Sequence, residues 1–452
     1  MITAAEVTES LGSLLLEARP AGARRFRRAV VDSRQAGRGD LFVALPGARR
    51  DGHEFVPEAL ARGARGLLVR EAPDAPPGVA VFVASDTLAA LQRLAAGRRD
   101  RRRAKVIGIT GSVGKTTTKE ITAAVLGARY PVLKNEANYN TEIGLPLTLL
   151  ELTHRHRRAV LEMAMRGPGQ IRELCQIARP EVGVITNVGP SHLEQLGSLE
   201  AIAAAKAELL EHLPPHGFAV LNGDDPLVRS LASRTRARPV FFGTSPDADA
   251  RASDVESRGL AGVSFRLHWR GESATVETLL PGRHLVSDAL AAAAVALVDG
   301  FSLAETASAL AGARVAPRLR VRSGRGGCTL LDDTYNASPA SMAAALDLLA
   351  ELPGRRVAVL GDMRELGAAE REAHLEVGRR AAEVADVIHG VGDLGVLIAE
   401  GALEAGHAAT HAWPDTTAAT EAIAADLRPD DVVLVKASRA LALETLVEAL
   451  TN

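Results

Sequence analysis

Hydrophobic residues recur along the chain in short blocks that are bounded by glycine, proline or charged residues, and these blocks alternate with alanine-rich segments. Before residue 100, the apolar runs 41–44, 67–69 and 79–83 predict short strands, whereas the spacing from Thr87 to Ala96 predicts a helix. Strands that alternate with helices in this way are typical of a small α/β domain.

The same alternation continues from about residue 104 to residue 314, with a helical pattern after each strand. We expect the strands of this region to end at Thr110, Glu162, Asn187 and Asn222. Such repeats predict a mostly parallel sheet that binds ligands at the carboxyl ends of its strands. Between residues 263 and 280, apolar and polar residues alternate strictly, which predicts an antiparallel insertion.

The pattern starts again after residue 315 and predicts a third, doubly wound, Rossmann-like domain. Its expected strands are 329–331, 357–360, 387–388 and 432–435. The fold class is therefore α/β with three domains: a small one at 1–100, a central one with a mostly parallel sheet at 101–314, and a C-terminal one at 315–452.

Composition narrows the class of protein. The 452 residues are 47% hydrophobic and 24% charged, which is usual for a globular chain, and a net charge of −2 argues against a nucleic-acid binder. Two cysteines are too few for a disulfide framework. We find no secretory signal at the N-terminus and no apolar run of about 20 residues, so we expect a soluble cytoplasmic protein.

The basic run at 98–103 separates the first two predicted domains. A run this short is typical of a solvated linker or helix end, and we assign it no nucleic-acid site.

The strongest chemical signal is a glycine-rich segment, Gly-Ile-Thr-Gly-Ser-Val-Gly-Lys-Thr-Thr at 108–117, between a strand and a helix. Backbone N–H groups of such a loop and the following helix N-terminus bind phosphate oxygens, while Lys115 reaches the β- and γ-phosphates and Thr116 can ligate Mg²⁺. The strict phosphate-loop pattern has glycine where this chain has Ile109. The predicted nucleotide-binding residues are Gly111, Ser112, Val113, Gly114, Lys115, Thr116 and Thr117.

A bound nucleoside triphosphate needs a metal ion, and two neighbouring strands are followed by metal-binding residue types. Glu162 ends one strand, and His192 follows another across a Gly-Pro turn. We predict that both ligate Mg²⁺. Lys206, by contrast, lies in an apolar helical stretch, and its spacing alone predicts a solvent-facing lysine without a function.

A second glycine motif, G-x-G-x-x-G at 390–395, follows a short strand, and Asp415 lies where an acid that binds ribose would be expected. A lone match of this kind is weak. We interpret these glycines as a tight strand-to-helix turn.

Taken together, the motifs resemble the Mur ligases of peptidoglycan synthesis over nearly the whole chain. The similar blocks are 32–34, 39–45, 51–55, 110–116, 138–146, 161–164, 185–192, 222–225, 331–339, 360–367 and 435–439. The Mur form of the phosphate loop accounts for Ile109. Three residues depart from the family pattern: Asp288 stands where Asn is usual, Pro317 where Gly is common, and Ala437 where Gly is usual. The change at Asp288 puts an adenine contact in doubt.

The resemblance also implies roles for individual residues. Thr116, Glu162, His192 and Lys206 would hold two Mg²⁺ ions, with Lys206 carbamylated by CO₂. Lys115, Lys206 and Arg318 would be catalytic, with Arg318 reaching the triphosphate from the domain junction. Further nucleotide contacts would come from Asn222, Asp333 and Asn336. In the N-terminal domain, Ser33 and Arg34 would bind a UDP-sugar.

The C-terminal blocks resemble the branch of the family that adds D-alanyl-D-alanine to a UDP-N-acetylmuramoyl-tripeptide. The resemblance thus implies an ATP-dependent amide ligase that works through an acyl phosphate, as a monomer without nucleic-acid or membrane partners. Two alternatives stay open: a related ligase with another amine substrate, and a nucleotide-dependent switch or motor. A switch would hydrolyse ATP without either ligase substrate. The third residue of the stem peptide, meso-diaminopimelate or L-lysine, is also open.

Overall fold

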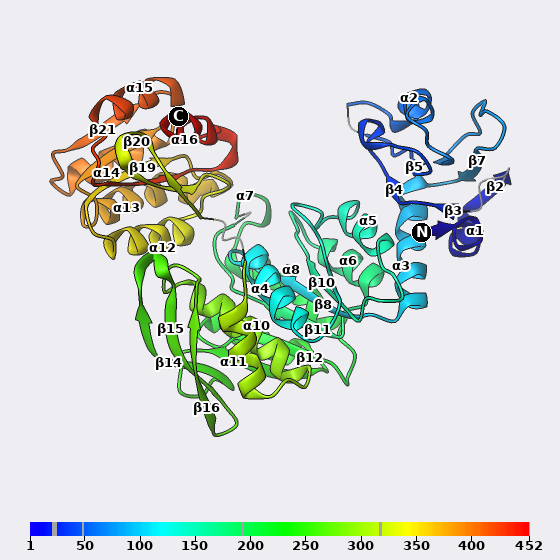
Figure 1. The fold of residues 1–452 in the computed structure, drawn as a ribbon, viewed down its shortest axis with the longest axis horizontal. Coiled ribbons are helices and arrows are strands. Elements are labelled where there is room, and N and C mark those ends of the chain that lie inside the picture. The colour runs from blue at the N-terminus through cyan, green and yellow to red at the C-terminus, as the bar shows by residue number, and fades with distance from the viewer. Residues whose placement is uncertain (20–24, 48, 192, 316–318, 452) are drawn as a thin grey trace.

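The computed structural model describes residues 1–19, 25–47, 49–191, 193–315 and 319–451. These residues form three α/β domains, each built around one larger sheet, in agreement with the predicted fold class. In the view of Figure 1 the N-terminal domain lies at the upper right, the central domain below and the C-terminal domain at the upper left. No helix in this part of the chain is long and apolar enough to cross a membrane.

The described residues of the N-terminal domain contain a five-stranded sheet in the order β2-β7-β6-β5-β4 and a small β1-β3 pair. The strands are β1 (Ile2–Thr3), β2 (Leu15–Arg19), β3 (Arg25–Phe26), β4 (Ala29–Val30), β5 (Leu41–Val43), β6 (Gly66–Val69) and β7 (Ala80–Ala84). The α-helices are α1 (Ala4–Leu11), α2 (Val56–Ala61) and α3 (Thr87–Arg102). All three predicted strands are confirmed, and the predicted helix is longer than its apolar pattern because it continues through the basic run.

The central domain contains a nine-stranded sheet in the order β16-β15-β14-β13-β12-β11-β8-β10-β9. The strands are β8 (Lys105–Thr110), β9 (Val132–Lys134), β10 (Arg158–Glu162), β11 (Val182–Ile185), β12 (Phe218–Asn222), β13 (Arg238–Gly243), β14 (Ala250–Ser257), β15 (Val263–Trp269) and β16 (Glu272–Thr278). Its α-helices are α4 (Lys115–Gly127), α5 (Gly144–Leu150), α6 (Gln170–Ala178), α7 (Leu193–Leu196), α8 (Leu199–Glu211), α9 (Pro226–Ser230), α10 (Leu285–Val298) and α11 (Leu303–Gly312).

Strands β9 to β14 of this sheet pair in parallel, whereas β14, β15 and β16 pair antiparallel. The predicted antiparallel insertion is therefore confirmed, but it continues the main sheet instead of forming a separate one. It also includes β14, which was not predicted because apolar and polar residues alternate only weakly in that strand. Strand β11 ends at Ile185, two residues earlier than predicted, because the next residues turn away to contact the glycine-rich loop.

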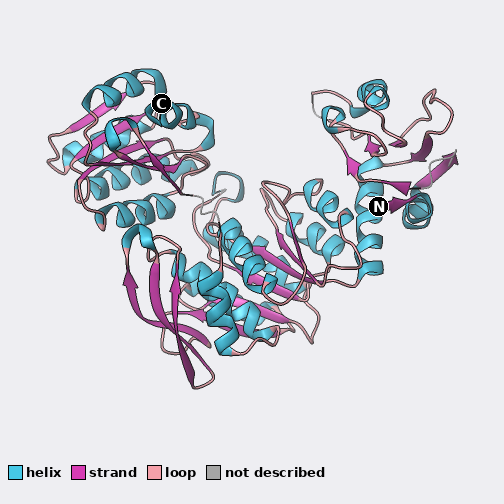
Figure 2. Cartoon of the chain, viewed as in Figure 1, coloured by secondary structure: helices cyan, strands magenta, loops and turns pink. Residues whose placement is uncertain are grey.

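The C-terminal domain has a six-stranded sheet in the order β17-β18-β22-β19-β20-β21 (Figure 2). The strands are β17 (Arg320–Ser323), β18 (Thr329–Asp333), β19 (Arg355–Gly361), β20 (Val387–Val391), β21 (Thr410–Trp413) and β22 (Asp431–Lys436). The α-helices are α12 (Pro339–Ala350), α13 (Glu370–Ala382), α14 (Gly395–Glu404), α15 (Thr416–Asp426) and α16 (Glu444–Thr451). The four predicted strands are confirmed, and the short edge strands β17 and β21 were missed since both are largely exposed and polar.

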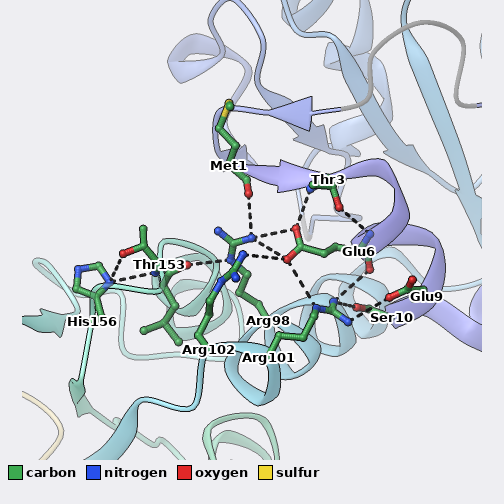
Figure 3. Close-up of polar contacts among 11 residues, drawn as sticks. Met1, Thr3, Glu6, Glu9, Ser10, Arg98, Arg101, Arg102, Thr153 and His156 are labelled. Carbon is green, nitrogen blue, oxygen red and sulfur yellow. Dashed lines mark hydrogen bonds and ion pairs between the residues drawn. The ribbon is translucent and has the colours of Figure 1, made fainter.

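The basic run at 98–103 was interpreted as a solvated linker or a helix end. It lies at the end of α3, but part of it is buried. Arg98 is 2% exposed and donates to both carboxylate oxygens of Glu6 and to the carbonyls of Met1 and Leu152 (Figure 3). Arg99 is also buried. A buried guanidinium must be paired, and here α1 and the 150–153 turn supply the partners. The run therefore connects the N-terminal and central domains by packing.

Candidate functional site

The glycine-rich loop joins β8 to α4 at the positions that the sequence predicted. Gly111 and Gly114 have φ angles of 152° and 84°. A Cβ atom on Gly111 would lie 1.8 Å from Thr186 Oγ1, and one on Gly114 would lie 2.5 Å from Asp288 Oδ1, so both positions require glycine. The first N–H groups of α4 have no acceptor within the helix, which makes this turn suited to an anion.

Lys115 folds back over this loop. Its Nζ donates to the carbonyl oxygens of Gly111 and Ser112, at 2.7 and 3.0 Å. The loop is braced by Asn187, two residues after the neighbouring strand β11, because its Oδ1 accepts from Val113 N at 2.9 Å and its carbonyl accepts from Ser112 N. Asn187 was predicted only as a strand end, and its bracing role has no signature in the sequence pattern.

Glu162 reaches the start of α4 from β10, which lies beside β8 in the sheet. Its side chain is buried and accepts two hydrogen bonds of 2.8 Å, from Thr116 Oγ1 to Oε2 and from Asn140 Nδ2 to Oε1. The structure thus brings together two predicted metal ligands, Thr116 and Glu162. Asn140 was not predicted as a site residue.

Asn135 holds the backbone of Glu162 in place from the end of the edge strand β9. Its Oδ1 accepts from Glu162 N at 2.9 Å and its Nδ2 donates to Glu162 O at 3.1 Å. Asn135 is fully buried, and Lys119 Nζ donates to its carbonyl at 2.6 Å. The one signal for Asn135 in the sequence is that a polar residue directly follows a strand.

Mg²⁺ prefers oxygen ligands, and the residues at this place supply a hydroxyl and a carboxylate, so the donor set fits that ion. Within the described part of the chain, no group of three or more His, Cys, Asp or Glu side chains could hold a metal ion. A magnesium ion at Thr116 and Glu162 would therefore complete its octahedron with phosphate oxygens and water. His192, the other predicted ligand, lies outside the described residues.

Lys206 is buried in α8 with 1% of its surface exposed, so the prediction of a solvent-facing side chain is wrong. Helix α8 is apolar on most of its circumference and packs against β8, β11 and α6, which accounts for the burial of this lysine. Burial lowers the pKa of Lys206 well below its usual range, and the nearby charge of Lys115 lowers it further. Among the described residues, its ammonium has no hydrogen-bonding or ionic partner.

The other predicted nucleotide contacts lie on two domains. Asn222 ends β12 and donates to Thr186 O at 2.8 Å. Asp333 ends β18 and pairs with Lys436, whose Nζ also donates to Asn336 O. Arg318 lies outside the described residues, as does Pro317.

The junction between the central and C-terminal domains includes the first turn of α10. His284 precedes α10 and keeps an exposed surface, but the protein atoms packed around its ring lower its pKa, and the charges of Asp333 and Lys436 also act on it. Further along the helix, Asp288 Oδ1 accepts from Thr118 Oγ1 at 2.6 Å, beside the glycine-rich loop. The ends of β18 and β22 therefore lie near the helix that carries Asp288.

The two predicted UDP-sugar residues lie in the N-terminal domain. Ser33 is buried, and its hydroxyl donates to Glu58 Oε2 at 2.6 Å. The Arg34 side chain is 79% exposed and pairs with Asp32. Arg34 can therefore reach a ligand without loss of a buried contact.

The second glycine motif forms the turn that we predicted. Asp362 Oδ1 accepts from the backbone N–H groups of Leu394 and Gly395 at the start of α14, where a dinucleotide phosphate would otherwise lie. Asp415 caps α15 by accepting from Thr417 N and Ala418 N. Both acids are thus used for helix capping.

Family models match the chain in three consecutive parts. Residues 29–109 match "Mur ligase family, catalytic domain", residues 109–296 match "Mur ligase middle domain", and residues 317–439 match "Mur ligase, glutamate ligase domain". The three matches follow the order of the three larger sheets.

Known proteins align over almost the full length. The UDP-N-acetylmuramoyl-tripeptide–D-alanyl-D-alanine ligase of a Synechocystis strain is 41% identical, over 94% of this chain and 92% of its own. A crystal structure of MurF from Acinetobacter baumannii superposes with a TM-score of 0.88 at 33% identity, over 99% of this chain and 98% of its own. The MurF ligase of Thermotoga maritima, solved with ADP, gives a TM-score of 0.82 at 32% identity, over 94% and 97%.

Proposed function

The chain belongs to the Mur ligase family, and from this membership we propose that it joins D-alanyl-D-alanine to a UDP-N-acetylmuramoyl-tripeptide at the expense of ATP. The observation that carries this proposal is the full-length similarity to ligases of that name. Two further observations support it: Glu162 on β10 accepts from Thr116 beside the glycine-rich loop, and the charge of Lys115 acts on Lys206. A nucleotide switch would need neither the N-terminal nor the C-terminal domain of this family.

A carboxylate is a poor electrophile, so the reaction first activates it. The tripeptide carboxylate attacks the γ-phosphorus of ATP, and the bond to ADP breaks, which gives an acyl phosphate. The unprotonated amine of D-alanyl-D-alanine then attacks the acyl carbon; the tetrahedral intermediate loses phosphate, and the nitrogen loses its proton. In this scheme Lys115 leaves its loop carbonyls to bind the β- and γ-phosphates, and together with the N-terminus of α4 it offsets charge on the departing ADP.

Lys206 is the residue that we propose to be carbamylated. Its lowered pKa supports this, because only the unprotonated amine adds to CO₂, and the addition releases one proton and leaves an anion. That anion would provide, with Thr116, Glu162 and His192, oxygen and nitrogen ligands for two Mg²⁺ ions. When bound, Mg²⁺ would neutralise part of the negative charge of the triphosphate.

The domains divide this work in the proposal. Residues 1–100 hold the UDP-sugar, with contacts from Ser33 and Arg34, and residues 101–314 bind ATP. Residues 315–452 bind the amine substrate. The nucleotide is contacted from this domain by Arg318, Asp333 and Asn336, and from the central domain by Asn222. Approach of the C-terminal domain would exclude water from the acyl phosphate. We propose that the protein works as a monomer in the cytoplasm, where ATP is available.

Phosphate release by the purified protein tests this function. The assay contains ATP and Mg²⁺ with UDP-N-acetylmuramoyl-tripeptide, D-alanyl-D-alanine, both or neither, and it is run with the meso-diaminopimelate and the L-lysine tripeptide. We expect rapid release only when both substrates are present, and one tripeptide to be preferred. Release at the full rate without either substrate would instead show a nucleotide-dependent switch.

A further inference from the structure

Asp362 connects three strand ends of the C-terminal sheet. It follows β19, is 1% exposed, and its Oδ1 accepts from the start of α14, which follows β20. Its carbonyl oxygen accepts from Ser438 N, which follows β22. The carboxyl ends of β19, β20 and β22 are thus fixed relative to one another by one buried acid.

The same acid holds the guanidinium of Arg364. Arg364 Nη2 lies 2.5 Å from Asp362 Oδ2, and the Arg364 side chain is 47% exposed. A guanidinium has five N–H donors in a planar fork, so one bond to Asp362 orients it and leaves other donors for a ligand. The next residue, Glu365, has a φ angle of 66°, a left-handed conformation that costs a non-glycine residue about 1 kcal/mol.

The loop that carries Arg364 contacts the central domain. Gly367 follows in this loop, and a Cβ on it would lie 3.4 Å from the Cα of Glu194 in α7. Helix α7 belongs to the central domain and comes directly after the Gly-Pro-Ser-His segment at 189–192. The loop of Arg364 therefore faces the domain that binds ATP in the proposed function.

Further polar side chains follow β18 and β22 at the same edge of the sheet. Ser438 is 4% exposed, and its Oγ has no hydrogen-bond partner among the described residues. The guanidinium of Arg439 lies over the ring of Tyr335, 5.6 Å from its centroid. A buried hydroxyl without a partner costs free energy, which a bound oxyanion would recover.

We propose that Arg364, oriented by Asp362, binds the terminal carboxylate of the D-alanyl-D-alanine substrate, with the Ser438 hydroxyl as a second donor. This inference rests on the proposed function. At neutral pH the dipeptide carries one carboxylate and one amine, and the amine must stay free to attack. The carboxylate is therefore the group through which a protein can orient the dipeptide, and a fixed guanidinium matches its geometry.

The test compares the KM values of two dipeptides for the wild type and for Arg364→Ala. D-alanyl-D-alaninamide has the same shape as D-alanyl-D-alanine but no carboxylate. For Arg364→Ala we expect the KM for D-alanyl-D-alanine to rise about 30-fold or more, while the KM for ATP and for the tripeptide stay within about twofold. The amide should bind the wild type more weakly than the acid, and Arg364→Ala should no longer distinguish the two.

Arg371→Ala is the matched control, because Arg371 is an exposed arginine of α13 that pairs with Glu400. It should leave every KM unchanged. Where turnover of the amide is too slow to follow, its inhibition constant against D-alanyl-D-alanine replaces its KM.

Two outcomes overturn the inference while the proposed function stands: an unchanged KM for D-alanyl-D-alanine in Arg364→Ala, or an equal loss for acid and amide. Absence of dipeptide-dependent phosphate release in the wild type would instead overturn the proposed function. The two failures are thus distinguished by the wild-type measurement alone.

Discussion

The hydroxyl of Thr116 donates to Glu162 Oε2 at 2.8 Å, so the second residue of α4 and the last residue of β10 meet across two adjacent strands. Either oxygen could serve a hard cation, and their contact defines one point beside the glycine-rich loop. Asn140 and Asn135 occupy the remaining polar atoms of Glu162, which fixes the carboxylate before any ligand arrives.

Glu162→Gln should lower kcat at least about 100-fold and raise the Mg²⁺ concentration needed for half-maximal rate, because an amide keeps the shape but loses the charge. A magnesium titration of phosphate release measures both. Glu136→Gln is the control, since Glu136 is an exposed acid of the same domain. A wild-type magnesium requirement in Glu162→Gln would exclude Glu162 as a ligand.

Lys115→Ala should abolish ligation and leave the fold intact. Lys115 Nζ donates to two carbonyl oxygens of the glycine-rich loop, and such hydrogen bonds contribute roughly 1 kcal/mol each to stability. Loss of the proposed contact to the β- and γ-phosphates would instead cost several kcal/mol in the transition state. Turnover and thermal melting of the variant are compared with the wild type. Retention of more than about a tenth of the turnover would contradict the assigned role.

Lys206→Ala should be nearly inactive, and acetate or formate should restore part of the rate by taking the place of the carbamate oxygens. The expectation follows from a buried amine whose pKa is lowered by burial and by the nearby charge of Lys115. Phosphate release is measured with increasing acetate, with chloride at equal ionic strength as the control. Near-normal turnover without any added carboxylate would show that Lys206 is not modified for catalysis.

Lys206→Met should raise the melting temperature by at least about 2 °C at pH 7 in CO₂-free buffer. The folded-state pKa of Lys206 lies below its unfolded value, so the unfolded chain binds more protons, and the wild type loses stability as the pH falls from about 10.5 towards the folded pKa. Methionine does not titrate. The difference should therefore shrink as the pH approaches 10, and a constant difference across this range would contradict the lowered pKa.

Arg98→Ala should reduce the free energy of unfolding by about 3 kcal/mol, because the buried Glu6 carboxylate then keeps only its hydrogen bond from Thr3 N and the longer ionic contacts to Arg101 and Arg102. Urea unfolding followed by circular dichroism measures the loss. Arg103 belongs to the same basic run but is exposed, and Arg103→Ala should change stability by less than about 0.5 kcal/mol. Equal effects of the two substitutions would mean that the buried network is not the cause.

Strand ends and the glycine-rich loop could be predicted because each rests on local chemistry: a run of buried apolar residues that stops, then a residue that can turn. Burial of Lys206 could not be predicted in this way, since it depends on which elements cover α8 from both sides. The same holds for Asn135 and Asn187, whose partners lie 27 and 74 residues away along the chain. Spacing finds what a residue is next to in sequence, whereas these contacts depend on sheet order.

Helix α3 has a mechanical consequence. It is continuous from Thr87 to Arg102, packs on α1 of the N-terminal domain, and packs on α5 and α6 of the central domain. Gln92 of this helix contacts Glu173 of the central domain, and Arg98 contacts Glu6 of the N-terminal domain, so a change in the angle between the two domains would have to break side-chain contacts of one helix. We therefore expect the first two domains to move as one rigid body, so that the distance from Ser33 and Arg34 to the glycine-rich loop stays constant if the C-terminal domain moves.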